Sequence, residues 1–394
     1  MSIASGALYG LRYIAEVTYG VTPGTPVMKA LRFLAGPGLD LQKEGYRSNE
    51  VRADRQVSNF RHGMRKVVGS IPFELSIGTY DDFLAAALSG AWTAVTSGAQ
   101  TFSTTVTDVV RGAGSFITDG FQKGDIVTLT GFTQGPTNGT WKVSAVTATN
   151  LSLCVVATGV ACAFTTETAA AGKTVAVTGK KLQCGTAALQ SFTIEEAYTD
   201  ILQFFPYRGV AINTFDLSIK PGAIVTGSFG LLGKDLTTPS GTTIASSVTA
   251  AVSNAPMDAF NGSIFEGTIN AAGLMATITG MDLKLTNNRG VQGVVGSNTT
   301  AGVFEGQSEV SGTVTAFFTD ATLFNKFLNE THSFIEVRLN DANGTDFIRI
   351  QIPNAVYTGG TITPPKDGPV VIALPFFAAL DTTTGTNLIM QKSN

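Results

Sequence analysis

The chain has 394 residues, enough for two or three domains. Only 14% of the residues are charged and the net charge is −3, which argues against a general nucleic-acid-binding protein. The longest apolar run, about 11 residues at 370–380, is far shorter than the roughly 20 residues of a membrane-spanning helix. We therefore expect no contact with membranes.

The first residues, "MSIASGALYGLRYIAEVTYG", lack the basic start and continuous apolar core of a signal peptide. The chain contains three cysteines: Cys154, Cys162 and Cys184. Their number is odd and their spacing does not suit a metal, so we expect reduced thiols in a protein made in the cytoplasm. Abundant glycine, 44 residues, suits strands joined by tight turns.

The N-terminal part, 1–92, contains three notable segments. A strand is predicted at "GLDL" (38–41), and another at "VVGSIPFELS" (67–76). A short helix is predicted at 80–88, with Phe83 and Leu84 on its apolar face. Between the strands lies a basic stretch, 44–68, which we interpret as a mobile loop because it holds few apolar residues.

Residues 93–186 alternate apolar and polar residues in short runs, with turn signals such as Asn138-Gly139. This pattern predicts a small inserted β-barrel or sandwich. After it, 187–235 reads as strand, Pro/Gly turn and strand, and completes the first domain. Residues 236–258 are rich in Ser and Thr, which favours a linker or extended arm.

The C-terminal part, 259–394, repeats the pattern of 1–92 joined to 187–235. "GMDL" (280–283) matches "GLDL", and "VSGTVTAFFT" (310–319) matches 67–76. A second helical pattern follows at 320–330, and in it Phe327 and Leu328 correspond to Phe83 and Leu84. "SFIEVR" (333–338) matches "SFTIEE" (191–196), and 354–374 matches 210–229. Because these matches keep their order, the chain is predicted to hold two tandem copies of one β-domain.

Catalytic signatures are weak. The only histidines are His62 and His332, and neither stands in a pattern typical of a catalytic triad. "GQSEV" (306–310) lacks the second glycine of a nucleophile elbow, and "ETAAAGKT" (167–174) lacks the first glycine of a phosphate-binding loop. We therefore expect no enzyme activity, no cofactor and no metal.

Three stretches together resemble the major tail tube protein of long-tailed bacteriophages: 16–33, 51–92 and 192–234. The resemblance implies a mainly β fold, a sandwich or half-barrel with a short flanking α-helix in each copy. It also implies that subunits join their sheets into rings, and that the rings stack around a channel through which DNA passes during genome ejection. Inserted domains would decorate the outside of such a tube.

The same resemblance implies a location in the virion tail, after assembly in the host cytoplasm. Implied partners are other copies of the chain, a tape measure protein in the lumen, and the tail terminator and distal tail proteins, with only transient, non-specific passage of DNA. Since single-copy members form six-membered rings, two copies per chain favour a trimer with pseudo-sixfold symmetry, and a hexamer remains the alternative.

The basic stretch occupies the place of the family loop that bridges successive rings. Its cations exceed its acids by three, whereas the matching stretch of the second copy, 285–309, has a net charge of −1. We therefore expect inter-ring contact between basic and acidic groups. The predicted contact residues are Arg47, Arg52, Arg55, Arg61, Arg65, Lys66, Glu305 and Glu309. A solvated loop, or contact with the lumen or the tape measure protein, are alternatives.

A second function fits the same composition: a tail-tip or receptor-binding adhesin whose inserted β-domain contacts the host surface. Copy number discriminates the two hypotheses, because a tube protein is abundant in the particle and a tip protein is not.

Overall fold

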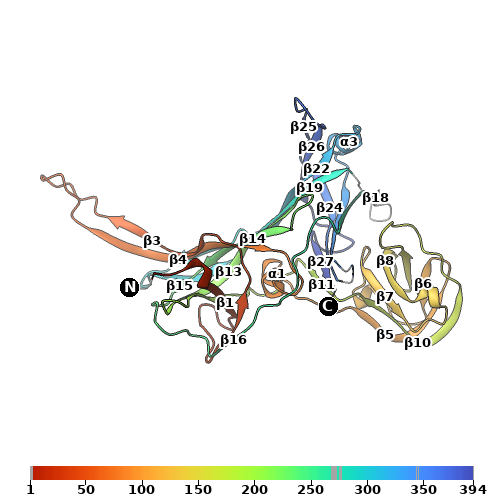
Figure 1. The fold of residues 1–394 in the computed structure, drawn as a ribbon, viewed down its shortest axis with the longest axis horizontal. Helices are drawn as coiled ribbons and strands as arrows, with labels where there is room; N and C mark the ends of the chain where they lie inside the picture. Colours follow the sequence, from red (N-terminus) through yellow and green to blue (C-terminus); the bar gives the residue numbers. More distant parts are fainter. Residues whose placement is uncertain (1–2, 268–272, 275–276, 343, 345, 394) are drawn as a thin grey trace.

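The structure is a computed structural model that describes residues 3–267, 273–274, 277–342, 344 and 346–393. The fold is mainly β, as predicted, with few and short helices. Figure 1 shows three parts: a central sheeted body, a long hairpin that projects from one end, and a separate barrel at the other end.

The first copy consists of a 3-10 turn, one α-helix and a series of strands. These are η1 (Gly6–Leu8), β1 (Tyr9–Ala15), β2 (Val27–Leu31), β3 (Gly38–Arg47), β4 (Phe60–Glu74), α1 (Asp81–Ala87), β11 (Lys180–Gln183), β12 (Phe192–Tyr198), β13 (Gln203–Ile219), β14 (Thr226–Gly233), β15 (Asp235–Leu236) and β16 (Ser247–Thr249).

The second copy follows the same plan. Its elements are β17 (Gly262–Gly267), β18 (Gly273–Leu274), β19 (Ile278–Thr286), β20 (Gly290–Gly293), β21 (Thr300–Phe304), β22 (Glu309–Phe317), α3 (Thr322–Leu328), β23 (Ser333–Asn340), β24 (Phe347–Tyr357), β25 (Thr361–Thr363), β26 (Val371–Ala378) and β27 (Ile389–Lys392).

Both copies have the same antiparallel strand order. The first runs β3-β4-β14-β13-β12-β1, and the second runs β19-β22-β26-β24-β23-β17. The expected tandem fold is therefore present. Alternating residues of these strands enter one apolar core that is shared by the two copies.

The register of the match between "GLDL" and "GMDL" was wrong. Leu39 lies opposite Gly69 and Leu283 lies opposite Gly312, so the ladders match Leu39 with Leu283 and not with Met281. A strand repeats its apolar side every two residues, and a slip by two leaves the pattern unchanged.

The two helices were also matched out of register. Each is followed by a residue with a left-handed backbone, Ser89 with φ 47° and Glu330 with φ 50°. This common feature places Phe83 at the position of Phe324, not of Phe327. Because apolar positions recur every three or four residues along a helix, the sequence pattern alone allows either alignment.

The inserted segment forms a closed six-stranded barrel, as the sequence pattern predicts. Its elements are β5 (Thr96–Thr104), β6 (Asp108–Arg111), α2 (Phe116–Asp119), β7 (Ile126–Thr130), η2 (Gly135–Thr137), β8 (Gly139–Val146), β9 (Asn150–Cys154) and β10 (Glu167–Val177). The barrel has its own core, which includes Phe102, Phe116 and Leu129. Strand β11 follows the barrel in the chain but pairs with β27 of the second copy.

The arm after the first copy wraps back over that copy. Strand β16 pairs in parallel with β2, and Asn254 Nδ2 donates to the Ile77 carbonyl at 3.0 Å. The ladder satisfies backbone groups of the arm, which lacks enough apolar residues to form a core of its own, and the Asn254 amide satisfies a backbone carbonyl of the first copy.

The helices of the two copies differ in burial. In α1, Phe83 is fully buried and stacks on Phe192 with ring centroids 5.0 Å apart. In α3 no residue is fully buried, and Phe324 is only partly covered. The second copy therefore carries an apolar helix that its own chain covers incompletely.

We predict that Phe83→Ala lowers the free energy of unfolding by about 3–5 kcal/mol, because it removes a fully enclosed ring and leaves a cavity. The matched change Phe324→Ala should cost the isolated subunit clearly less. Urea unfolding of the two variants tests this, and equal losses would contradict the burial difference.

Candidate self-association surface

The two copies are joined by direct strand pairing. Residues 214–219 of β13 pair antiparallel with residues 281–286 of β19. Leu217 lies opposite Leu283, and both side chains are buried. On the other face Asp216 lies opposite Lys284, and Ser218 Oγ donates to Asp282 Oδ1 at 2.6 Å. One continuous sheet therefore crosses from the first copy to the second.

The corresponding edges at the two ends of this sheet have no ladder partner among the described residues. Strand β3 occupies the place of β19 in the first copy, and it pairs only with β4. Strand β25 corresponds to the C-terminal part of β13, the part that pairs with β19, and it pairs only with β26. Open edges of this kind are ready sites for pairing with another chain.

Exposed apolar residues of the second copy correspond to buried residues of the first. By ladder position Ile362 matches Leu217, and their exposed fractions are 38% and 2%. Phe318 N–H donates to Val370 O just as Leu75 N–H donates to Val225 O, both at 2.9 Å. Phe318 is 36% exposed whereas Leu75 is fully buried. A second chain at the β25 edge would equalise these environments.

The face of the sheet opposite the core is polar and carries few large side chains. A groove of about 830 Å³ runs across the junction between the copies and is lined by residues such as Asp216, Ser228, Asp282 and Thr313. Burial raises the pKa of Asp216, and the nearby Lys284 counteracts this rise in pKa. Alternation along the strands places Asp40, Glu74, Asp216 and Asp282 on this face together with Lys66 and Lys284, so its carboxylates outnumber its cations.

The basic stretch expected as a loop is largely a β-hairpin. Strand β3 continues to Arg47, opposite Phe60 of β4, so only 48–59 connects the strands. The hairpin projects far from the sheeted body (Figure 1). Its few apolar residues, such as Tyr46 and Phe60, are exposed. These strands are held together by backbone hydrogen bonds, and their side chains are mostly polar. A search for alternating apolar residues therefore misses them.

Four of the predicted contact cations are exposed on this hairpin. Arg47, Arg55 and Arg61 point to solvent, and Arg52 pairs with Asp54 at 2.8 Å within the connection. Lys66 is partly covered in β4.

Two of the other predicted residues, Arg65 and Glu305, have acidic or basic partners within the chain. Arg65 Nε lies 2.9 Å from Asp235 Oδ1, and its backbone N–H donates to Asn298 O of the second copy. Glu305 pairs with the buried Arg289 at 3.1 Å, and Glu309 lies opposite Thr286. No ion pair among the described residues joins the six cations to these two acids.

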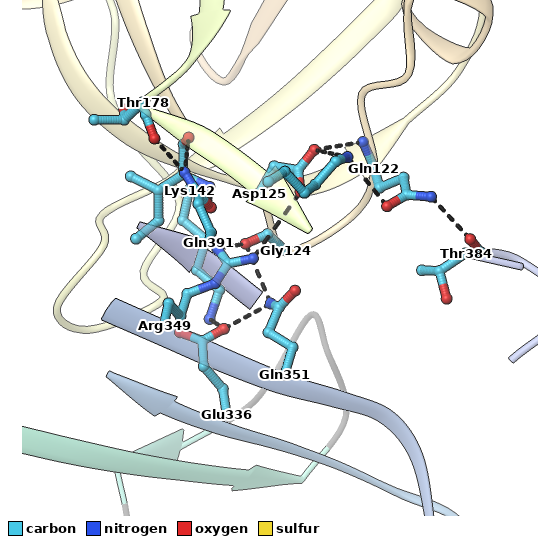
Figure 2. Close-up of polar contacts among 12 residues, drawn as sticks. Gln122, Gly124, Asp125, Lys142, Thr178, Glu336, Arg349, Gln351, Thr384 and Gln391 are labelled. Atoms are coloured by element: carbon cyan, nitrogen blue, oxygen red, sulfur yellow. Dashed lines mark hydrogen bonds and ion pairs between the residues drawn. The ribbon is translucent and has the colours of Figure 1, made fainter. Parts of the chain in front are cut away.

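The barrel is held to the second copy by a buried polar contact (Figure 2). Lys142 of the barrel pairs with Glu336 of β23 at 2.9 Å, and both side chains are almost fully buried. Arg349 of β24 donates to Gly124 O. Gln391 of β27 bonds both the N–H (3.0 Å) and the carbonyl (2.8 Å) of Ile126.

Further charges complete this contact. Lys181 of β11 pairs with Asp125 of the barrel at 3.0 Å, and Lys142 Nζ lies 5.2 Å from the ring centre of Phe265 and 5.5 Å from that of Phe334. Sequence reasoning missed this cluster. The signal was present in "SFIEVR" and "FIRIQI", where charged or amide residues interrupt strands that are otherwise apolar.

The histidines play local roles. His62 packs edge-on against Phe60, and His332 Nδ1 contacts Asn354 Oδ1. Within the described residues no group of three or more His, Cys, Asp and Glu side chains is placed to hold a metal ion. No helix in this part of the chain has the length and apolar character needed to cross a membrane.

A family model described as "Phage tail tube protein" matches residues 6–378, nearly the whole chain. A search of curated proteins finds no match.

We predict that Glu336→Gln weakens the docking of the barrel. The substitution keeps the shape of the side chain but leaves the buried Lys142 without its counter-charge, which typically costs about 3–5 kcal/mol. Urea unfolding followed by the fluorescence of Trp141, a barrel residue, should show the loss. The exposed pair supplies the control: Asp54→Asn should leave unfolding unchanged. An equal response of the two variants would contradict the assigned role of the buried pair.

Proposed function

Because the chain belongs to the phage tail tube protein family, we propose that it is the major tail tube subunit. In this proposal its copies close into rings, and the rings stack around the channel through which DNA leaves the particle. The chain would act in the virion tail after assembly in the host cytoplasm.

The pairing of β13 with β19 carries this proposal, because it supplies a template for contact between chains. The β25 edge of one chain would receive β3 of the next chain, as β13 receives β19 within the chain. By ladder position Ile362 would then lie opposite Leu39, as Leu217 lies opposite Leu283. Such a head-to-tail contact closes into a ring when the rotation between units allows it.

Ring size follows from the number of sheets that each chain provides. Every chain contributes two sheets of equal strand order, so three chains would supply a ring of six sheets with pseudo-sixfold symmetry. A hexamer would instead need twelve sheets around one channel, or an arrangement in which one copy stays outside the ring. Because both copies have the same strand order, we expect both to take part in the ring, and this favours the trimer.

The polar face of the sheet would line the channel. Its excess of carboxylates would repel the phosphates of DNA, whereas a basic lining would bind them strongly and in a salt-dependent way. Small side chains such as Ser218, Ser228 and Ser311 leave this face smooth. The tape measure protein would fill the lumen before DNA passes, and tail terminator and distal tail proteins would contact the ends of the tube.

The projecting hairpin would reach the next ring. Its exposed Arg47, Arg52, Arg55 and Arg61 would then meet acidic groups there, which sets register and specificity more than affinity. Glu309 stays a proposed partner. Arg65 and Glu305 would contribute less, since both already pair within the chain.

We predict that Ile362→Asp abolishes ring formation while the subunit stays folded. Ile362 is partly exposed in the single chain, but it would be buried against Leu39 of a neighbour, where an unpaired carboxylate is costly. Negative-stain electron microscopy and size-exclusion chromatography measure the result.

The matched control for this test is Val160→Asp, an exposed position on the barrel. It adds the same charge away from the sheet edges and should leave assembly intact. Normal rings from Ile362→Asp, or no rings from the control, would refute the proposed edge contact.

A separate test addresses stacking. We predict that Arg55→Ser with Arg61→Ser lowers the yield of tubes without changing the thermal unfolding of the subunit, because neither arginine has an ion-pair partner in the described chain. High salt should have the same effect on the unaltered protein through screening. The contrasting variant Arg65→Ser should lower subunit stability, because it removes the closer cation of Asp235 and leaves only Arg208, 3.9 Å away. Tubes that form normally from the double variant would rule out the stacking role.

A further inference from the structure

Two turns of equal length hold matching positions in the copies. In the first copy, 219–225 links β13 to β14 after the last pair, Ser218 with Thr226. In the second copy, 364–370 links β25 to β26 after the pair of Thr363 with Val371. The sequences are "IKPGAIV" and "PPKDGPV". By position, Pro221 therefore corresponds to Lys366.

The first of these turns docks against the second copy. Ile219, Lys220 and Pro221 form one wall of a small cleft of about 230 Å³, whose opposite wall includes Ile264 and Val337. Backbone bonds hold the turn in place: Ala259 N–H donates to Ala223 O at 3.1 Å, and Val225 N–H donates to Met257 O at 2.9 Å. A turn of one copy thus packs beside a specific cleft of the next copy.

The first copy has the equivalent cleft. Leu11 lies opposite Glu196 as Ile264 lies opposite Val337, so the two clefts share their framework. The cleft of the first copy measures about 460 Å³, and no turn of this kind forms part of its lining. Its wall is rich in aromatic rings instead. Tyr9 packs against Phe33 and Tyr198, with ring centroids 5.3 Å and 5.1 Å apart.

We propose that this cleft binds the proline-rich turn 364–370 of a neighbouring copy of the chain. The inference rests on the proposed ring, and it adds a second contact beside the joined strands. The turn lies directly after β25, so a neighbour whose β25 pairs with β3 carries 364–370 to the mouth of the cleft.

The chemistry of the two surfaces is complementary. Pro364, Pro365 and Pro369 are exposed on the turn, and rigid prolines bind well to grooves lined by aromatic rings. Lys366 would face Glu196, which accepts the Leu39 N–H at 3.0 Å on the floor of the cleft. Within the chain the corresponding residues are Pro221 and Val337. Inside the chain this contact is apolar, whereas between chains it would join a base, Lys366, to an acid, Glu196. This difference would favour binding of the neighbour's turn 364–370 over binding of a second turn 219–225.

A thiol cross-linking experiment tests the proposal. Ala35→Cys, on the exposed rim of the cleft, is combined with Lys366→Cys on the turn, and assembled rings are treated with a short bifunctional maleimide. The matched pair Thr279→Cys with Pro221→Cys holds the corresponding places in the cleft of the second copy. The unsubstituted protein controls for its three natural cysteines.

We expect the first pair to give covalently linked chains on denaturing gels, with a cross-linked peptide containing both substituted positions. The matched pair should link only within one chain. Intact rings in which the matched pair reacts but the first pair links no chains would overturn the docking, and the ring itself would stand. Absence of rings from the unsubstituted protein would instead refute the proposed function.

Hydrogen exchange keeps the proposal testable if the cysteine variant does not assemble. In the unsubstituted protein, amides of 33–36 and of Lys366–Gly368 should exchange at least tenfold more slowly in rings than in free subunits. Unchanged exchange at both segments in assembled rings would overturn the proposal.

Discussion

The backbone pairing of β13 with β19 is the contact on which the arrangement of this molecule depends. It merges two copies of one β-domain into a single sheet, and it satisfies one edge of each copy. Because the copies share the same strand order, the contact also defines what the two remaining edges, on β3 and β25, are shaped to receive. The exposure of Ile362 follows from the same cause, since the second copy has no third copy beside it in the chain.

The barrel fixes the relation between the copies in a second way. It is inserted in the first copy but docks on the second through Lys142, Glu336 and Arg349. Buried ion pairs of this kind contribute little net stability compared with apolar contacts, but breaking one is costly. They therefore suit an interface that must form in one orientation only. In the proposed tube, a barrel held in this way would stay clear of the sheet edges that assembly needs.

The sequence allowed the β class, the tandem copies and the inserted barrel to be predicted, because apolar alternation and turn residues record them directly. The register of the strands could not be predicted from the sequence, because a slip by two residues preserves the apolar pattern. In the structure Leu39 matches Leu283 rather than Met281. The hairpin strands around Arg61 were taken for a loop because they bury almost nothing. The docking of the barrel through Glu336 depends on contacts between residues about 190 positions apart, and no local pattern reports those. Of the six predicted contact cations, Arg65 alone has an acidic partner outside the hairpin, Asp235, which lies far away in the sequence.

In the proposed ring, the contact between chains repeats the contact between copies. A reconstruction of assembled tubes by electron cryomicroscopy tests it most directly, at a resolution that separates strands. We expect three chains in each ring, with β3 of one chain paired to β25 of the next and Leu39 opposite Ile362. Six chains in each ring, or a β3 edge that faces solvent in the assembled tube, would contradict it.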